Sequence, residues 1–271
     1  MLLKLHRYLV YYNFFISCCS IALLFYFSLV LHKNIEAPVY IFTFSSTLFV
    51  YNLFRHYQSV KEFLSSYRTP LFVITTYAFV ISIACFTLLP KSLQLAYGIL
   101  GVLTLFYKFP LVGNVSLRAL PYIKIVVIAV VWVLSALISF MKAPGLKPDP
   151  GSAGIYILMQ FLFFISICIP FDIFDMHRDT MSTIPQKIGA KRAILVSYLG
   201  MVFYLVLAFL LPCGPIQKGG YFLMTMCTCF VLRYSKALKH KYSRYYLIDG
   251  LIILQTGIVF LCQYHDQIVE L

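Results

Sequence analysis

Three aspartates, Asp172, Asp175 and Asp179, lie within eight positions of a chain that has only nine acidic residues. On an α-helix, spacings of three and seven residues place their carboxylates within an arc of about 60°. Such a stripe repels itself unless a cation neutralises it, and oxygen ligands without a neighbouring cysteine suit Mg²⁺. We therefore predict a catalytic Mg²⁺ site on these three residues. The alternative is a solvated loop helix whose acids are balanced by cations such as Arg178 and Lys187.

The composition identifies the class of protein. The chain is 61% hydrophobic and 11% charged, whereas soluble domains carry about 25% charged residues. We expect a single domain over residues 1–271, embedded in the cell membrane and in contact with lipid. The net charge of +13 does not indicate nucleic-acid binding, because no soluble basic segment is present. The eight cysteines are scattered, and we interpret them as apolar filler.

Nine apolar segments are long enough to span or nearly span a bilayer. They cover residues 8–31, 38–54, 70–89, 92–107, 121–141, 154–171, 192–212, 219–233 and 245–264. With the N-terminus in the cytoplasm, 17 of the 22 lysines and arginines fall on the cytoplasmic side, as the positive-inside rule requires. The sequence therefore predicts an all-α bundle of nine transmembrane helices, with the three aspartates at its cytoplasmic face.

The aspartate pattern D-x-x-D-x-x-x-D is followed by T-x-P-x-x-x-G, which here is Thr183, Pro185 and Gly189. This arrangement resembles the second aspartate-rich motif of the UbiA superfamily of intramembrane prenyltransferases. That family has nine helices, a cytoplasmic N-terminus, and aspartate motifs on the loops after helices 2 and 6. The nine-segment count places Asp172 after the sixth helix, in agreement with the family.

The resemblance implies an activity. Members of the family bind an isoprenoid diphosphate through Mg²⁺, ionise its allylic C–O bond and add the prenyl group to an acceptor. We therefore expect a polyisoprenyl diphosphate and a small acceptor, aromatic or lipid-like, as the partners of this chain. A developing charge on the leaving diphosphate would be stabilised by metal and by basic side chains.

The first motif of the family, N-D-x-x-D-x-x-x-D, is largely missing. After Asn52 the chain has Leu53, His56 and Val60 where the aspartates would stand. A polar face with helical spacing nevertheless remains, formed by Asn52, Arg55, His56 and Ser59. We predict that Arg55 grips phosphate oxygens directly and replaces a second metal ion. The alternative is an arginine that snorkels to the headgroups beside an interfacial histidine.

Other charged residues could contribute to the same pocket. Lys108, Arg118 and Lys124 lie at predicted cytoplasmic ends and could hold phosphate oxygens, although each could equally be a topological charge. Asp249 lies inside the last apolar segment and must find a partner or stay protonated. It either forms a salt bridge with Lys124 or lines the polar pocket. We count Arg178, beside the aspartates, among the substrate-binding candidates.

A second function is compatible with these residues. Because the first aspartate motif is missing, the chain could be a non-catalytic relative that binds an isoprenoid lipid. It could also be a small transporter that uses the same polar cavity.

Overall fold

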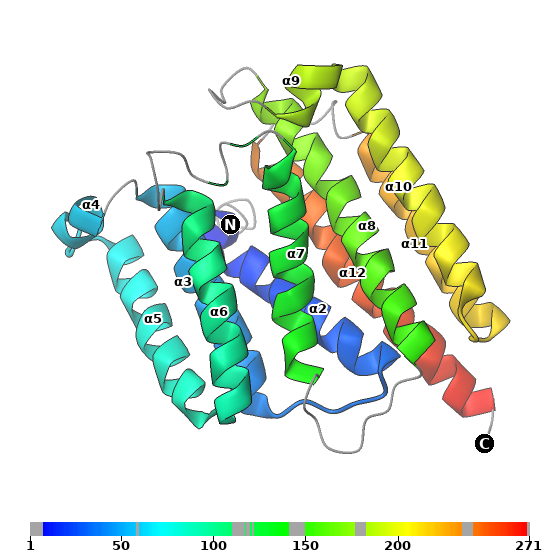
Figure 1. The fold of residues 1–271 in the computed structure, drawn as a ribbon, viewed down its shortest axis with the longest axis horizontal. Helices are drawn as coiled ribbons and strands as arrows, with labels where there is room; N and C mark the ends of the chain where they lie inside the picture. Colours follow the sequence, from blue (N-terminus) through cyan, green and yellow to red (C-terminus); the bar gives the residue numbers. More distant parts are fainter. Residues whose placement is uncertain are drawn as a thin grey trace.

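The computed structural model describes residues 8–57, 60–109, 117, 120, 122–140, 150–176, 183–234 and 241–269. This part of the chain is helical (Figure 1). The long helices are α2 (Phe14–Val30), α3 (Ala37–His56), α5 (Pro70–Leu88), α6 (Lys91–Lys108), α7 (Ile123–Leu137), α8 (Pro150–Asp175), α10 (Ala190–Leu210), α11 (Pro215–Tyr234) and α12 (Lys241–Val269). The shorter elements are α4 (Val60–Ser65), α9 (Ile184–Ile188) and a 3-10 turn, η2 (Ile138–Phe140).

Each of the nine predicted apolar segments overlaps one long helix. By length and composition, six stretches qualify as membrane spans: α3, α5, α7 with η2, α8, α10 and α12. The outward surfaces carry large apolar side chains, such as Leu88 and Leu95, which are 70% and 69% exposed. Exposing so much apolar surface to water would be unfavourable, whereas contact with the hydrocarbon of a bilayer is not. The chain is an integral, multi-pass membrane protein.

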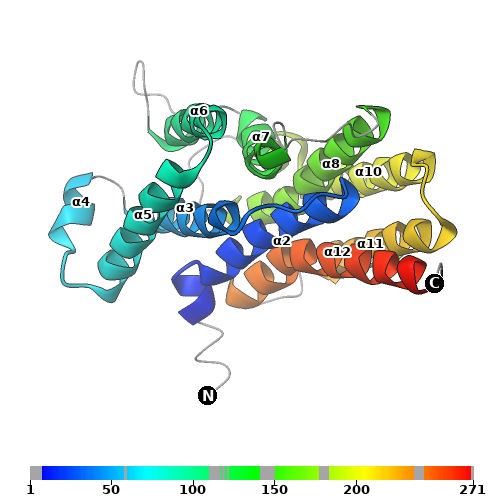
Figure 2. The same cartoon turned by 90° about the horizontal axis from the view of Figure 1, so that it is seen from below.

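The helices form two facing rows when the molecule is seen from below (Figure 2). One row contains α5, α3, α2 and α12, and the other contains α6, α7, α8 and α10. Contacts between α2 and α7 join the rows, and α11 closes one end against α10 and α12. The carboxyl ends of α3, α6 and α8 meet the amino ends of α7 and α12 at the upper edge in Figure 1. Among the described residues, the charged side chains Arg55, Lys124, Asp172 and Asp175 lie near this edge.

The first apolar segment is broken near its start. The segment over 8–31 was expected as one helix, but α2 begins only at Phe14, after Asn13. Asn13 adopts a left-handed conformation with φ of 60°, which asparagine tolerates better than other side chains. The turn before it leaves the carbonyls of Val10 and Tyr11 available as hydrogen-bond acceptors for side chains of α3.

The T-x-P-x-x-x-G pattern has a structural role at the upper edge. Thr183 is the N-cap residue of the short helix α9, and its backbone N–H donates to Gln186 Oε1 at 2.9 Å. Pro185 occupies the first turn, where a missing N–H costs nothing. Gly189 ends α9 with φ of 83°, a conformation that favours glycine. The motif thus forms the short helix α9 and the glycine turn that leads directly into α10.

Candidate active site

A cavity of about 220 Å³ opens at the upper edge, between α2, α3, α7, α8 and α12. Its apolar lining includes Trp132, Phe164 and Phe171. Its polar and charged lining comprises Asn13, Tyr51, Arg55, Lys124, Cys168, Asp172, Asp175, Tyr245 and Asp249. Five of the predicted site residues therefore meet here, namely Arg55, Lys124, Asp172, Asp175 and Asp249.

The α8 wall carries two of the three predicted aspartates. Asp172 is buried, with 4% of its surface exposed, and its Oδ1 lies 2.7 Å from Lys124 Nζ on α7. Asp175 lines the same cavity and is the last residue of α8. The part of the stripe that the structure describes therefore holds two carboxylates. Arg178 and Asp179 fall outside the described residues. Sequence analysis offered Asp249 as the partner of Lys124, whereas the ion pair in the structure is with Asp172.

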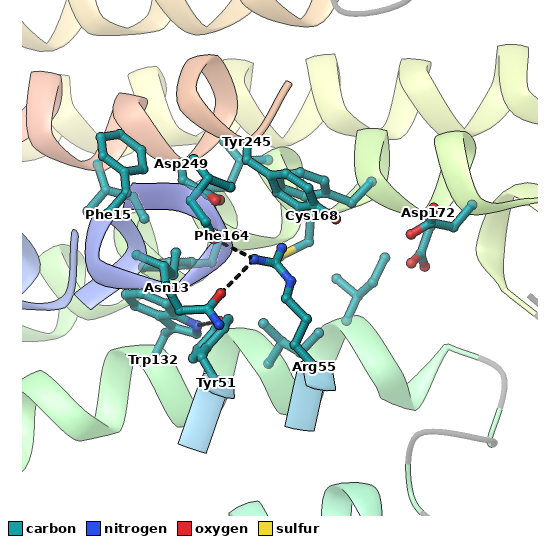
Figure 3. Close-up of a pocket in the computed structure, with 18 of the residues that line it drawn as sticks. Asn13, Phe15, Tyr51, Arg55, Trp132, Phe164, Cys168, Asp172, Tyr245 and Asp249 are labelled. Atoms are coloured by element: carbon teal, nitrogen blue, oxygen red, sulfur yellow. Dashed lines mark hydrogen bonds between the residues drawn. The ribbon is translucent and has the colours of Figure 1, made fainter. Parts of the chain in front are cut away.

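The α3 wall is organised by hydrogen bonds between neutral groups and one guanidinium. Arg55 Nη1 donates to Asn13 Oδ1 at 2.6 Å and, more weakly, to the Val10 carbonyl at 3.4 Å. The Arg55 guanidinium lies over the Tyr245 ring, 4.3 Å from its centroid, as a cation–π pair does. Asn52 is fully buried and accepts from Asn13 Nδ2 at 2.7 Å. Figure 3 shows Arg55 held between Asn13 and Tyr245.

Two further predicted residues, His56 and Lys108, lie outside this cavity. His56 Nε2 is 2.9 Å from the Tyr11 carbonyl. Lys108 Nζ donates to the carbonyls of Leu53 and Phe54 at the end of α3, at 3.3 and 2.7 Å, and also to the Tyr57 carbonyl. Neither His56 nor Lys108 lines the cavity. In this structure Lys108 caps the carboxyl end of α3, where a cation is favourable. Arg118 falls outside the described residues.

Asp249 lies on α12 and lines the cavity together with Arg55 and Cys168 (Figure 3). The guanidinium of Arg55 attracts it electrostatically. Among the described residues, however, the only ion pair within 4.0 Å in this cavity is the one between Lys124 and Asp172. Of the two expectations for Asp249, the place in the polar pocket is the one that the structure supports.

A second, larger cavity of about 480 Å³ lies below the first, between α3, α6 and α7. Its α3 side extends from Phe42 to Arg55, which corresponds to about 20 Å along the helix axis. Five side chains line both cavities: Tyr51, Arg55, Ile128, Trp132 and Tyr245. Trp132 Nε1 donates to the Tyr51 hydroxyl at 3.1 Å. The first cavity, which holds the charged side chains, thus meets the second cavity, a long and mostly apolar slot, at a wall of aromatic side chains beside Arg55.

Sequence reasoning missed four residues of this site: Asn13, Tyr51, Trp132 and Tyr245. Asn13 did carry a signal, because a lone amide inside an apolar run must find partners in the protein. Trp132 is the only tryptophan in the chain, but nothing in the sequence shows that it lines this cavity. Nothing in the sequence sets Tyr51 and Tyr245 apart from the other tyrosines, of which the chain has 21 in all.

No family model matches the sequence, and no curated protein matches it. The fold, in contrast, is similar to solved structures. A UbiA homolog from Archaeoglobus fulgidus bound to GPP and Mg²⁺ aligns with a TM-score of 0.62 at 13% identity, over 93% of this chain and 98% of that one. An apo UbiA homolog from Aeropyrum pernix K1 gives 0.61 at 13% identity, over 93% and 98%. A digeranylgeranylglyceryl phosphate synthase structure gives 0.57 at 14% identity, over 95% and 97%.

These alignments extend over nearly the whole chain, so the protein has the fold of the UbiA homologs. The structural comparison confirms the resemblance that the aspartate pattern indicated. At identities of 13 to 14% the likeness concerns the fold.

Proposed function

We propose that this protein binds an isoprenoid diphosphate at the upper edge of the bundle and transfers its prenyl group to a small acceptor. The observation that carries this proposal is the pair of joined cavities. Carboxylates and cations line the first, which suits a diphosphate and its metal ion. The second is long and mostly apolar, which suits a hydrocarbon chain. Solved UbiA homologs have been captured with GPP or DMAPP and Mg²⁺.

The carboxylates of α8 are suited to a hard divalent cation. Asp172 and Asp175 lie one helical turn apart and line one cavity, and oxygen is the donor that Mg²⁺ prefers. Among the described residues no cluster of three ligating side chains is preassembled. We propose that Asp179 completes the site and that Asp172 is shared between Lys124 and the metal. Bound there, Mg²⁺ would neutralise charge that develops on the leaving diphosphate.

Charge balance in the cavity favours a single metal ion. Two cations, Arg55 and Lys124, face three carboxylates, Asp172, Asp175 and Asp249. This sum is one negative charge among the described residues, and Asp179 would make it two. One added Mg²⁺ removes this excess negative charge, which would otherwise repel a diphosphate. On the α3 wall, where the family has its first aspartate motif, Arg55 offers a fork of donors that can hold phosphate oxygens. We propose one metal on the α8 wall and direct basic contacts from the α3 wall.

Non-catalytic binding of an isoprenoid lipid is the second candidate, and a small transporter with the same cavity is a variant of it. One observation favours it: the Lys124 ammonium already neutralises Asp172 at 2.7 Å. A protein that only holds a lipid headgroup could keep this ion pair intact, with no need of Mg²⁺.

One experiment separates these functions. The purified protein in lipid nanodiscs is titrated with geranyl diphosphate, with Mg²⁺ or with EDTA, and diphosphate release is followed over time. A prenyltransferase binds tightly only with Mg²⁺, with a dependence that fits one metal site, and releases diphosphate. Binding of the same affinity with EDTA as with Mg²⁺, and no release of diphosphate, would support the lipid-binding candidate. Two cooperative metal ions would contradict the single-metal site.

We also propose that all nine long helices span the membrane, as one domain, with the N-terminus and the upper edge in the cytoplasm. The distribution of lysines and arginines supports this orientation. A reporter fused after Lys239 should then report the cytoplasmic side, and one fused after Leu271 the opposite side. Equal readings at both positions would contradict nine spans.

A further inference from the structure

Asp249 is a carboxylate at membrane depth that the proposed diphosphate site does not use. It lies within the apolar span Arg244–His265, about 8 Å along the axis from the first residue of that span. A charged side chain at such a position is costly and is usually functional. Most of its neighbours on the same helix are apolar, so Asp249 does not belong to a solvated, charged face of α12.

The surroundings fix the backbone of Asp249 and leave its carboxylate facing the cavity. Cys19 Sγ donates to the Asp249 backbone carbonyl at 3.3 Å, which ties α2 to α12 at this point. Arg55 acts on the carboxylate electrostatically, but the hydrogen bonds of its Nη1 go to Asn13 and the Val10 carbonyl. The carboxylate therefore lies in the electrostatic field of Arg55, and it forms no direct ion pair with another described residue.

Asp249 also stands opposite the metal-binding wall. Asp172 and Asp175 project from α8, whereas Asp249 projects from α12, one helical turn after Tyr245. Tyr245 lines both cavities, so Asp249 lies close to the place where they meet. A diphosphate bound on the α8 side with its chain in the slot would bring its reacting carbon near this junction.

We propose that Asp249 is the base that accepts the proton from an acceptor's hydroxyl group during prenyl transfer. This inference rests on the proposed function. The C1–O bond of the prenyl diphosphate breaks, and its electron pair leaves with the diphosphate. The acceptor oxygen forms the new bond to C1 as its O–H bond breaks. The hydroxyl proton moves to a carboxylate oxygen of Asp249 and from there to water.

The test uses geranyl diphosphate and Mg²⁺ alone, because water can act as the hydroxyl-bearing acceptor. Wild type, Asp249→Asn, Asp249→Glu and Asp175→Asn are compared in nanodiscs. The dissociation constant, kcat and KM for diphosphate release, and the rate ratio between H₂O and D₂O are measured. Asp249→Asn should lower kcat on the order of 100-fold, leave the dissociation constant within about twofold, and abolish the solvent isotope effect. Asp249→Glu should recover part of kcat.

The contrast with Asp175→Asn makes the result decisive. That variant should weaken binding, whereas Asp249→Asn should not. An unchanged kcat in Asp249→Asn, or a loss of binding equal to that of Asp175→Asn, would overturn the role as a base. If wild type binds no geranyl diphosphate, the proposed function itself fails. If wild type binds it but releases no diphosphate, the protein is a binder and Asp249 has no proton to accept.

Discussion

The α8 wall and the α3 wall of the cavity differ in how their polar groups are used. On α8, Asp172 and Asp175 face the cavity, and the ion pair of Asp172 is with a cation that lines the same space. On α3, Asn52 and His56 contact Asn13 and the Tyr11 carbonyl, and Arg55 is the charged residue of this helix that lines the cavity. One wall therefore carries two carboxylates, which we propose as metal ligands, and the other carries a single cation held by Asn13 and Tyr245.

This difference shows that the region without the first aspartate motif still has an ordered polar structure of its own. Where the family has aspartates after its second helix, this chain has a hydrogen-bonded unit of Asn13, Asn52 and Arg55. That unit positions one guanidinium at the junction of both cavities. Four variants test whether the two walls have these separate roles.

The largest effect is expected on stability, from Lys124→Met on the α8 side. The change leaves Asp172 buried without its cation, and breaking a buried pair in this way costs about 3–5 kcal/mol. The free energy of unfolding should fall accordingly, measured by denaturant unfolding in detergent. Lys91→Met, an exposed lysine at the opposite edge, is the matched control. The double variant with Asp172→Asn should recover much of the loss, and a double variant no more stable than Lys124→Met would contradict a direct pair.

Asp175→Asn tests the metal-binding role of the same wall. Removing one hard ligand should weaken Mg²⁺-dependent binding of geranyl diphosphate about 10–100-fold at limiting Mg²⁺, while the protein remains folded. Isothermal titration in nanodiscs measures the change. Glu36→Gln, which removes an exposed acid at the amino end of α3, should have no effect. Unchanged binding in Asp175→Asn would remove the basis for a metal site on α8.

Arg55→Ala tests the opposite wall. Loss of a charge-assisted donor should cost about 2 kcal/mol of diphosphate affinity, or roughly 30-fold. Lys61→Ala removes the same charge from the exposed helix α4 and should cost much less. The same titration compares the two variants. Equal losses would mean that only the overall positive charge matters and that Arg55 is an interfacial residue.

The smallest effect is expected from Lys108→Met. Because Lys108 caps the carbonyls at the end of α3, its removal should lower the free energy of unfolding by about 0.5–1 kcal/mol. Affinity for geranyl diphosphate should stay within twofold. A large loss of affinity with unchanged stability would restore Lys108 as a substrate-binding residue.

The helices were largely predictable because apolar runs of membrane length have few alternatives. The segments over 70–89 and 192–212 match α5 and α10 within two residues at each end. The break at Asn13 was not predicted, since it depends on a single left-handed residue inside an apolar run. Sequence alone shows that an amide is present, but not that the backbone turns there to meet Arg55.

The site was predicted in part. The sequence identified Asp172, Asp175 and Arg55 because their charges contrast with apolar surroundings. It could not tell which polar side chains contact backbone carbonyls, as His56 and Lys108 do. It also could not place α7 beside α8, which is what pairs Lys124 with Asp172. Helix adjacency depends on packing between segments far apart in the chain.

The turn that ends at Asn13 has a practical consequence for purification. Its carbonyls and the Asn13 amide hold Arg55 and His56 in place, so residues 10–13 are a structural part of the candidate site. An affinity tag or a trimmed N-terminus that disturbs residues 8–13 would alter ligand binding without touching any charged residue. The tag therefore belongs at the carboxyl terminus, beyond α12 and at the opposite edge of the bundle from the cavity (Figure 1).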